Sequence, residues 1–593
     1  MCGIAGMVAD VSPVDLDSVR AMDQSVAHRG PDDAGLWSSA DGAVAFAHRR
    51  LSILDLSAAG HQPFVSAGER AVISYNGEIY NFRELRAELS AAGHPFRSQS
   101  DTEVILAGYL RSGEAFVERL RGMFAFAIWD ERERRCVIAR DRFGIKPLYY
   151  STTGGRLTFA SSVRALLRSG RVGTDPDPIA VQQYFRTGSV PEPRTLLADV
   201  KALEAGTIGT WHAGRFESRR YWSIRFEPEA MSWDDAVART RAALADSVTH
   251  HFVSDVPVGV FLSGGIDSTA LVALASQAGV GRIDTFSIAF PGEPGDEGAL
   301  ARRSAEHFGT THHEWPIDGA AGRELFERFV GVTDQPSIDG LNTYAVSKLA
   351  RDRGLKVVLS GVGGDELFGG YKSFRQLPAL TRLHRTLRTA GVSRAAAAVL
   401  PDRPKGRRMR EWLAGEATIE RGYEMFRGIF TCEESRRLTA HYLGRDAGSP
   451  ESAPAVTAER DGDRISALEL QRYLRNQLLR DADVMSMAWG LELRVPFLDN
   501  VVFDTVRRIP AALRLRPGKR LLIAAVPEVP GWIVTQPKRG FLLPIERWIG
   551  AQWSDVFARL DRTSPVPLES WYRKMCVMMF EGWLHSVRGG AHD

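Results

Sequence analysis

Cysteine is scarce in this chain, with four residues in 593, at Cys2, Cys136, Cys432 and Cys576. They are too scattered for a set of metal ligands or a disulfide framework, so we expect reduced thiols and a cytoplasmic location. The chain also lacks an apolar run long enough to cross a bilayer, and its first residues lack the charged and apolar parts of an export signal. We therefore expect no membrane partner.

An excess of charge of one sign is also missing, because 75 basic side chains are nearly balanced by 72 acidic ones. No overall field therefore favours nucleic acid as a partner. One stretch, 375–410, is rich in arginine but has no interleaved aromatic residues on which bases could stack. We interpret it as the solvated face of helices.

The length of the chain indicates two or more domains. Up to about residue 210, short β-like runs such as 71–75 and 123–129 dominate, which is typical of stacked antiparallel sheets. After a polar stretch at 211–233 that we expect to be irregular, apolar strands alternate with helical patterns, as in a parallel α/β sheet.

We therefore predict one domain at 2–210 and a second at 235–593. The first is of α+β type and the second of α/β type. Within the second, the composition at 442–463 becomes rich in Gly, Ser, Pro and Asp and predicts a mobile loop.

Cys2 is the first candidate for chemistry, because removal of the initiator Met would leave a thiol and a free α-amine on one residue. An α-amine has a pKa near 8, so at neutral pH part of it is unprotonated and can accept the thiol proton. The alternative, for a lone cysteine near a terminus, is a residue without a role in a disordered start.

Four downstream segments favour the catalytic interpretation of Cys2. Together with it they resemble the signature segments of class II glutamine amidotransferases, the N-terminal-nucleophile glutaminases, over roughly residues 2–200. The segments are 47–53 (AHRRLSI), 75–81 (YNGEIYN), 100–103 (SDTE) and 139–149 (ARDRFGIKPLY).

The resemblance implies that Cys2 attacks the glutamine amide, while the Asn76 side chain and the Gly77 backbone N–H hold the oxyanion. Without the family, Asn76-Gly77 predicts a hairpin turn between two strands, and both interpretations can hold.

The same resemblance implies a binding pocket for a zwitterion. Arg50 would pair with the α-carboxylate of glutamine through its planar fork. Glu78 and Asp101 would receive the α-ammonium and neighbouring polar groups.

A second site is indicated by an apolar strand at 256–262 that runs into Ser263-Gly264-Gly265-Ile266-Asp267-Ser268-Thr269 and then a helical pattern. Small residues at a helix N-terminus form a cradle for phosphate oxygens, although such a turn can also be a simple helix cap. The spacing of a Walker loop is absent. The turn resembles the pyrophosphate loop of ATP pyrophosphatases, which cleave ATP between the α and β phosphates.

Further segments resemble the synthetase half of the glutamine-hydrolysing asparagine synthetases, so the similarity covers nearly the whole chain. They are 359–371 (LSGVGGDELFGGY), 483–488 (DVMSMA), 491–499 (LELRVPFLD) and 536–541 (QPKRGF).

This resemblance implies that Asp267 and Asp365 ligate Mg²⁺ on the pyrophosphate and that Lys538 neutralises the reacting phosphoryl group. It also implies an ATP site, whose residues are Leu262, Ser263, Gly264, Gly265, Asp267, Ser268, Ile288, Ser360 and Gly361.

The implied reaction has two stages. A substrate carboxylate attacks the α-phosphorus of ATP to give an acyl-adenylate and pyrophosphate, and ammonia released from glutamine then attacks the acyl group to give an amide and AMP. Ammonia made inside the protein remains a free base next to a water-sensitive intermediate.

Three departures from the family pattern concern the acceptor. Val362 stands where the family has an acidic residue, Gln335 replaces a glutamate before an unusual segment at 337–344, and 161–163 lacks the customary glutamate. The resemblance predicts asparagine synthesis, whereas Val362 predicts that aspartate is a poor acceptor and that a peptide or specialised-metabolite carboxylate is preferred.

Other readings of the chain also stay open. A non-catalytic scaffold and a lactam-forming ligase are alternatives, although the first tends to lose the nucleophile or the metal carboxylates and the second needs no ammonia. The sequence does not settle the oligomeric state, for which a homodimer is one option.

Overall fold

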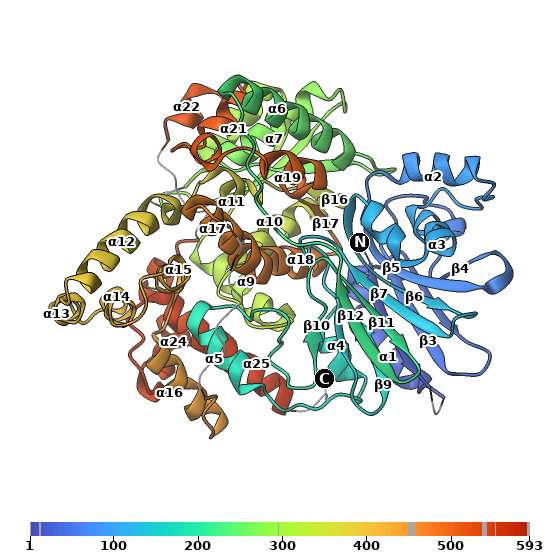
Figure 1. Ribbon diagram of the computed structural model, residues 1–593, viewed down its shortest axis with the longest axis horizontal. Helices are drawn as coiled ribbons and strands as arrows, with labels where there is room; N and C mark the ends of the chain where they lie inside the picture. The colour runs from blue at the N-terminus through green and yellow to red at the C-terminus, as the bar shows by residue number, and fades with distance from the viewer. Residues whose placement is uncertain are drawn as a thin grey trace.

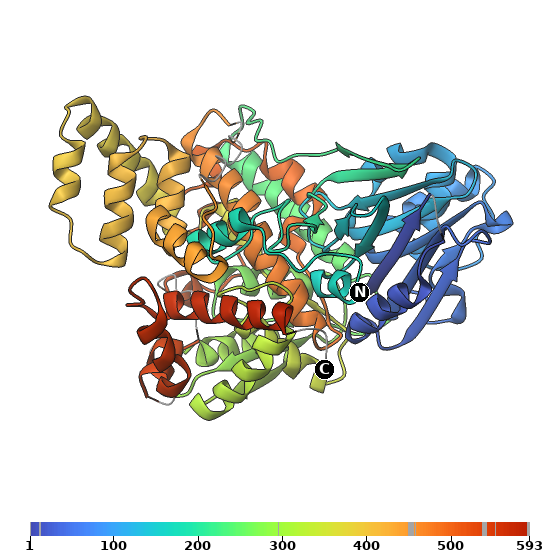
Figure 2. The same cartoon turned by 90° about the horizontal axis from the view of Figure 1, so that it is seen from below.

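The computed structural model describes residues 2–10, 13–293, 296–448, 456, 458–536, 543–551 and 553–589. Two antiparallel sheets form one end of the molecule, and a mostly helical part built on a parallel sheet forms the other (Figure 1). The chain begins at the junction between these two parts (Figures 1 and 2). None of the helices in the described ranges is long and apolar enough to cross a membrane.

The predicted pair of stacked antiparallel sheets is confirmed. The first has the strand order β10 (Lys201–Ala202), β8 (Tyr149–Ser151), β9 (Arg156–Ala160), β1 (Gly3–Ala9), β3 (Val44–Arg50) and β2 (Asp33–Ser38). The second has the order β12 (Arg215–Arg220), β11 (Thr207–His212), β7 (Arg135–Arg140), β6 (Gly122–Asp130), β5 (Ala71–Ile79) and β4 (Phe64–Val65). The helices of this part are α1 (Leu16–Ser25), α2 (Phe82–Ala91), α3 (Asp101–Ser112), α4 (Val163–Arg168) and α5 (Pro178–Thr187).

The alternation of side chains explains this layering. On β5, Val72 packs with the first sheet around Ile4 and Phe46, whereas Ile73 packs on the other face against α3. Because neighbouring residues of a strand point to opposite faces, a strand buried on both faces is apolar throughout.

One prediction for this region is wrong in part. The stretch 211–233 was expected to be irregular, which holds for 221–232, but it also contains the end of β11 and all of β12. The side chains of β12 are charged and mostly exposed, which is typical of an edge strand protected against further pairing and which hides it in the sequence pattern.

The predicted parallel sheet is also confirmed, with the order β15 (Thr311–Pro316), β14 (Asp284–Ala289), β13 (Val258–Phe261), β16 (Val357–Leu359) and β17 (Glu492–Arg494). The chain goes from β13 outward to β14 and β15, and then returns to the other side of β13. Loops that leave β13 and β16 therefore diverge at a topological switch point, where α/β sheets bind ligands.

Helices cover this sheet and extend away from it. Those near the sheet are α6 (Trp233–His251), α7 (Ile266–Gln277), α8 (Gly298–Phe308), α9 (Gly319–Val332), α10 (Leu341–Asp352) and α11 (Gly364–Phe368). The later ones are α12 (Lys372–Thr389), α13 (Ser393–Ala398), α14 (Pro404–Ala414), α15 (Ile419–Arg427), α16 (Cys432–Leu443), α17 (Asp461–Leu468), a π-helical stretch (Glu469–Leu479), α18 (Arg480–Met487), α19 (Asn500–Val506), α20 (Ala511–Arg514), α21 (Arg520–Ala525), α22 (Gly531–Val534), α23 (Ile545–Ala551), α24 (Ser554–Thr563) and α25 (Trp571–Arg588).

The arginine-rich stretch 375–410 lies in α12, α13 and α14, so its predicted helical character is confirmed. Figure 2 shows these helices at the end of the molecule far from the antiparallel sheets. The central part of the loop predicted at 442–463, namely 449–455 and 457, lies outside the described residues.

Helix α5 belongs to the N-terminal part in sequence but packs on the C-terminal helices (Figure 1). The Tyr184 hydroxyl donates to the Cys576 carbonyl oxygen at 2.8 Å, and the rings of Phe185 and Phe580 are 4.9 Å apart. The two parts of the chain are therefore interlocked.

Candidate active sites

Cys2 lies directly before β1, at the start of the chain. Its backbone N–H donates to Asn76 Oδ1 at 2.9 Å, and its carbonyl oxygen accepts from Arg29 Nε at 3.1 Å. Asn76 Nδ2 is buried and has no hydrogen-bond partner in the described part of the chain. The amide is thus held by its oxygen and keeps its N–H₂ group available, as an oxyanion donor requires.

The turn interpretation of Asn76-Gly77 is wrong, because both residues lie inside β5 and pair with Ala125 and Phe124 of β6. A Cβ atom on Gly77 would come within 2.2 Å of the Met123 carbonyl oxygen. Glycine is therefore needed here for close approach of two strands, and not for a turn.

The Cys2 thiol is only 7% exposed. Burial raises its pKa, and the positive charge of Arg50 and a hydrogen bond with the Leu51 backbone oppose this only in part. A protonated thiol is a weak nucleophile, so the site needs a base close to the sulfur.

Arg50 ends β3, and its guanidinium donates to the carbonyl oxygens of Leu54 (3.1 Å), Asp55 (2.5 Å) and Ser57 (3.2 Å). Gly60 packs so closely that a Cβ there would lie 2.0 Å from Arg50 Nη2. Neutral carbonyls orient the fork without cancelling its charge, which leaves a cation suited to a carboxylate ligand.

Asp101 starts α3 and accepts from the Tyr75 hydroxyl at 2.8 Å and the Ile79 N–H at 3.0 Å. Glu78 is buried nearby on β5, and its Oε1 lacks a hydrogen-bond partner among the described residues. Burial raises the pKa of both carboxyl groups. A ligand ammonium here would supply the charge that keeps them ionised.

The sequence interpretation missed Arg494, whose Nη2 bonds to Glu78 Oε2 at 3.0 Å across the junction. Arg494 lies in the segment 491–499 that carried the resemblance, but no residue spacing connects it to Glu78.

In the second part, the loop after β13 closes on itself as a helix-capping turn. Ser268 Oγ accepts from the Ser263 N–H at 3.1 Å, and Ser263 Oγ accepts from the Gly265 N–H at 3.2 Å. Gly265 caps α7, so the predicted order of strand, glycine turn and helix N-terminus is present.

The structure brings Asp267 and Asp365 together. Both carboxylates form ion pairs with Lys519 Nζ, at 2.5 Å for Asp267. Cβ atoms on Gly361 and Gly364 would contact Asp267, at 3.0 and 2.5 Å from its nearest atoms. The two loops of the switch point therefore lie against each other.

Lys519 is the second residue that the sequence interpretation missed. It has a left-handed φ of 56° after Gly518. Although burial lowers the pKa of its ammonium, the two carboxylates outweigh burial and raise the pKa to about 12. No motif pointed to it, because its role depends on distant loops.

The other predicted ATP-site residues lie along the same edge of the sheet. Leu262 follows β13, Ile288 is near the end of β14, and Ser360 and Gly361 follow β16. Leu262 and Ile288 are buried. Lys538 lies outside the described residues.

Two of the departures from the family pattern have structural roles at the junction. Gln335 Oε1 accepts from the Leu196 N–H at 3.1 Å, and Ser161 Oγ accepts from the Ile4 N–H at 3.0 Å. Val362 is half-buried between Gly361 and Gly363, at the edge of the hydrophobic core.

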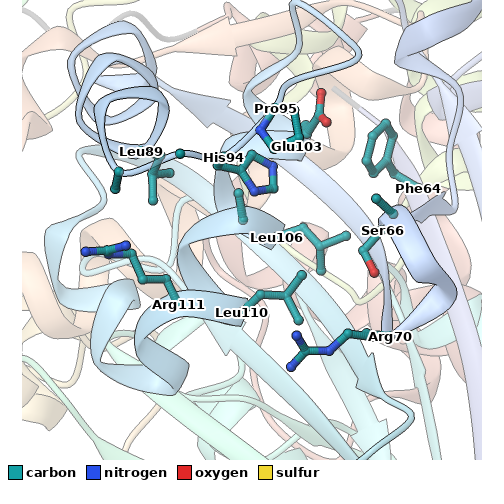
Figure 3. Close-up of a pocket in the computed structure, with 14 residues that line it drawn as sticks. Phe64, Ser66, Arg70, Leu89, His94, Pro95, Glu103, Leu106, Leu110 and Arg111 are labelled. Carbon is teal, nitrogen blue, oxygen red and sulfur yellow. The ribbon is translucent and has the colours of Figure 1, made fainter.

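A hollow of about 380 Å³ opens elsewhere, between β4, α2 and α3, and Leu106 and Leu110 of α3 border it (Figure 3). None of the predicted site residues lines it. It is therefore separate from both candidate sites.

Comparisons with known proteins agree with this arrangement. Residues 1–222 match a family model described as a glutamine amidotransferase domain, and residues 239–586 match one described as asparagine synthase. The glutamine-hydrolyzing asparagine synthetase 1 of Bacillus subtilis is 36% identical, covering 93% of this chain and 88% of its own length. A putative asparagine synthetase of Mycobacterium tuberculosis is 37% identical over 93% and 89% of the two chains, and amidase chry2 of Gibberella zeae is 29% identical over 88% and 84%. The chain belongs to the asparagine synthase family and carries a glutamine amidotransferase domain ahead of its synthase domain.

Proposed function

We propose that this protein is a glutamine-dependent amide synthetase that activates a carboxylate with ATP and releases AMP and pyrophosphate. The observation that carries the proposal is the pairing of a buried Cys2–Asn76 centre with a glycine-rich loop at the switch point of a parallel sheet. The Cys2 site would make ammonia, and the nucleotide site would consume it.

In the first half-reaction, the Cys2 sulfur attacks the amide carbon of glutamine and its proton passes to the α-amine. Asn76 Nδ2 and the Gly77 N–H would hold the oxyanion, while Arg50 and the Glu78–Asp101 pair would bind the two charged ends of glutamine. The α-amine returns the proton to the amide nitrogen, collapse of the tetrahedral species expels ammonia, and water then releases glutamate from the thioester.

In the second half-reaction, an oxygen of the acceptor carboxylate attacks the α-phosphorus of ATP, and pyrophosphate leaves. Ammonia attacks the resulting acyl carbon, AMP leaves, and a proton is lost to give the amide. The N–H groups at the start of α7 would face the leaving phosphates, because a helix N-terminus favours negative charge. Lys538 would add positive charge there.

Asp267 and Asp365 would hold Mg²⁺ on the pyrophosphate, which neutralises the leaving group. They converge on one cation already, the Lys519 ammonium. The described residues contain no group of three or more protein ligands. A hard cation with two carboxylates would complete its shell with phosphate and water oxygens.

The acceptor is the open part of the proposal. Aspartate is the acceptor that the relatives' names favour. Val362 favours a less polar carboxylate, because an apolar side chain cannot accept a proton from the attacking ammonia. The fungal relative named an amidase is compatible with this alternative.

A panel of carboxylates with ATP and glutamine tests the proposal, read by pyrophosphate release and product mass. Efficient conversion of aspartate to asparagine would reject the alternative acceptor and keep the synthetase. ADP and phosphate as the stoichiometric products would reject the ATP chemistry, and absence of turnover with every carboxylate would favour a non-catalytic scaffold. We also propose a cytoplasmic location. Sedimentation of the purified chain would show whether it forms a homodimer.

A further inference from the structure

Arg494 uses its side chain to join the two parts of the molecule. Its Nε donates to Glu492 Oε1 at 2.6 Å, and its Nη1 donates to the carbonyl oxygens of His251 and Val253, each at 2.7 Å. Its Nη2 reaches Glu78 Oε2 at 3.0 Å. The side chain is fully buried, so its position is fixed by these bonds.

The backbone of the same residue is part of the parallel sheet. The Arg494 carbonyl oxygen accepts from the Ser360 N–H at 2.9 Å, and Arg494 pairs with Leu359 in the β16–β17 ladder. Ser360 opens the loop that leads to Asp365. One residue therefore contacts a carboxylate of the glutamine pocket and the first residue of the nucleotide loop.

A hydrophobic contact runs beside this connection. Leu51 and Ile53, which follow Arg50 in the glutamine pocket, pack against Val357 of β16 in a small buried cluster. Strand β16, which ends just before Ser360, is thus held from the glutaminase side by a direct apolar contact and, through its neighbour β17, by an ionic one.

We propose that Arg494 is a positioning residue that couples glutamine binding at Glu78 to ATP binding at the Ser360 loop. The inference rests on the proposed function of the two sites. Glu78 and Glu492 both bond to Arg494, and Lys146 and the α-amine at the start of the chain add positive charge near Glu492. The α-ammonium of glutamine adds a positive charge beside Glu78, whose Oε1 has no partner among the described residues. It thereby fixes Glu78, the Arg494 guanidinium and the strand that carries Arg494.

Because coupling is reciprocal, ATP must tighten glutamine binding by the same factor by which glutamine tightens ATP binding. The measurement uses the full chain with Cys2→Ala, which cannot consume glutamine, and titration calorimetry with and without saturating ATP and Mg²⁺. We expect ATP to lower the Kd of glutamine about fivefold or more.

Arg494→Lys keeps the positive charge but cannot make the four directed hydrogen bonds of the guanidinium. In this variant, ATP should therefore lower the Kd of glutamine by less than about twofold. Arg121→Lys is the matched control. Arg121 is a second arginine of the junction, less deeply buried than Arg494, and it bonds to Asp499 at 2.9 Å and to Asp246 at 2.5 Å but contacts neither site. This control should keep the parental factor.

Glu78→Gln is a second variant, in case Arg494→Lys does not fold. It keeps the shape of the side chain and leaves every bond of the nucleotide loop intact. Without glutamine, the affinity of this variant for ATP should be unchanged. Glutamine, added at a concentration that saturates the weakened glutamine site, should no longer increase the affinity for ATP.

A pH profile separates positioning from mere structural support. Glu78 faces Arg494 and Glu492 on β17, Asp101 on α3, the ring of Tyr80 and the α-amine at the start of the chain. Burial raises its pKa and Arg494 lowers it, so in Arg494→Gln the carboxyl group takes up a proton. The Kd of glutamine should then fall as pH rises, and this trend should be stronger in Arg494→Gln than in the parent.

The outcomes are distinct. A parent that binds both ligands with a coupling factor of one overturns this inference and leaves the proposed function standing, as does an unchanged factor in Arg494→Lys or Glu78→Gln. A parent that binds neither glutamine nor ATP overturns the proposed function itself. Loss of coupling in Arg121→Lys as well would assign the effect to the junction as a whole and refute a special role of Arg494.

Discussion

Replacing Asn76 by aspartate tests the oxyanion site with almost no change of shape. The substituted carboxylate still offers an oxygen to the Cys2 N–H, which donates to Asn76 Oδ1 at 2.9 Å in the parent. It loses the Nδ2 donor, which has no other partner among the described residues, and it places an anion beside the developing oxyanion.

The loss of one oxyanion donor costs about 2.7–4 kcal/mol of transition-state stabilisation, or roughly 10²–10³ in kcat. Repulsion between the two anions adds to this. We therefore expect glutaminase activity, measured as glutamate release, to fall by at least about 10². Pyrophosphate release supported by ammonium salts should remain, because free ammonium makes glutamine hydrolysis unnecessary.

Asn81→Asp is the control, since Asn81 lies just beyond β5 and its Nδ2 donates to the Arg119 carbonyl oxygen. It should change glutamate release little. If Asn76→Asp releases glutamate within about tenfold of the parental rate, the assignment of Nδ2 to the oxyanion is wrong. A parallel loss of ammonium-supported activity would mean that the variant is misfolded, and Asn76→Ala would then decide.

Further expectations concern both sites and the stability of the chain. Cys2→Ala should abolish glutamine-supported amide formation and keep the ammonium-supported reaction, and glutamate release at the parental rate would contradict the nucleophile. Asp267→Asn and Asp365→Asn should each remove pyrophosphate release with ammonium and Mg²⁺, whereas full activity in both would exclude them as metal ligands. Lys519→Met should lower the free energy of unfolding by about 3–5 kcal/mol in urea denaturation, since it leaves two carboxylates without their buried partner; a loss below about 1 kcal/mol would show that the pair is compensated elsewhere. Burial raises the pKa of Asp481 to about 7. The folded state then binds a proton that the unfolded state releases above about pH 4, so stability falls as pH rises from about 4 to 7. Asp481→Asn should flatten that slope in thermal unfolding, and an unchanged slope would assign it to other groups.

Local patterns made the nucleotide loop predictable. The run from β13 through Ser263 to α7 is contiguous, so strand, glycine turn and helix can each be inferred from their own residues. Most strands of the antiparallel and parallel sheets were predictable for the same reason, since a short, mostly apolar run marks each buried strand.

Contacts between distant segments were not predictable. Asn76-Gly77 has the local signature of a turn, but pairing with β6 overrides it, because sheet hydrogen bonds and burial outweigh turn propensity. Arg494 and Glu78 are 416 positions apart, and Lys519 meets Asp267 only because two loops converge. The β12 strand was missed since its charged, exposed side chains carry no burial pattern.

The position of α5 limits how the molecule can be divided. A fragment ending near residue 210 would carry Phe185 without the ring of Phe580 that covers it, and a fragment starting near 235 would lack α5 altogether. Each piece would expose an apolar face that the intact chain buries, and such surfaces promote aggregation. A cut before α5 does not solve this, because β10, β11 and β12 follow α5 in the chain and would be separated from their sheets. Neither half can therefore be expressed alone, or exchanged between relatives, at a single cut without losing part of its own packing.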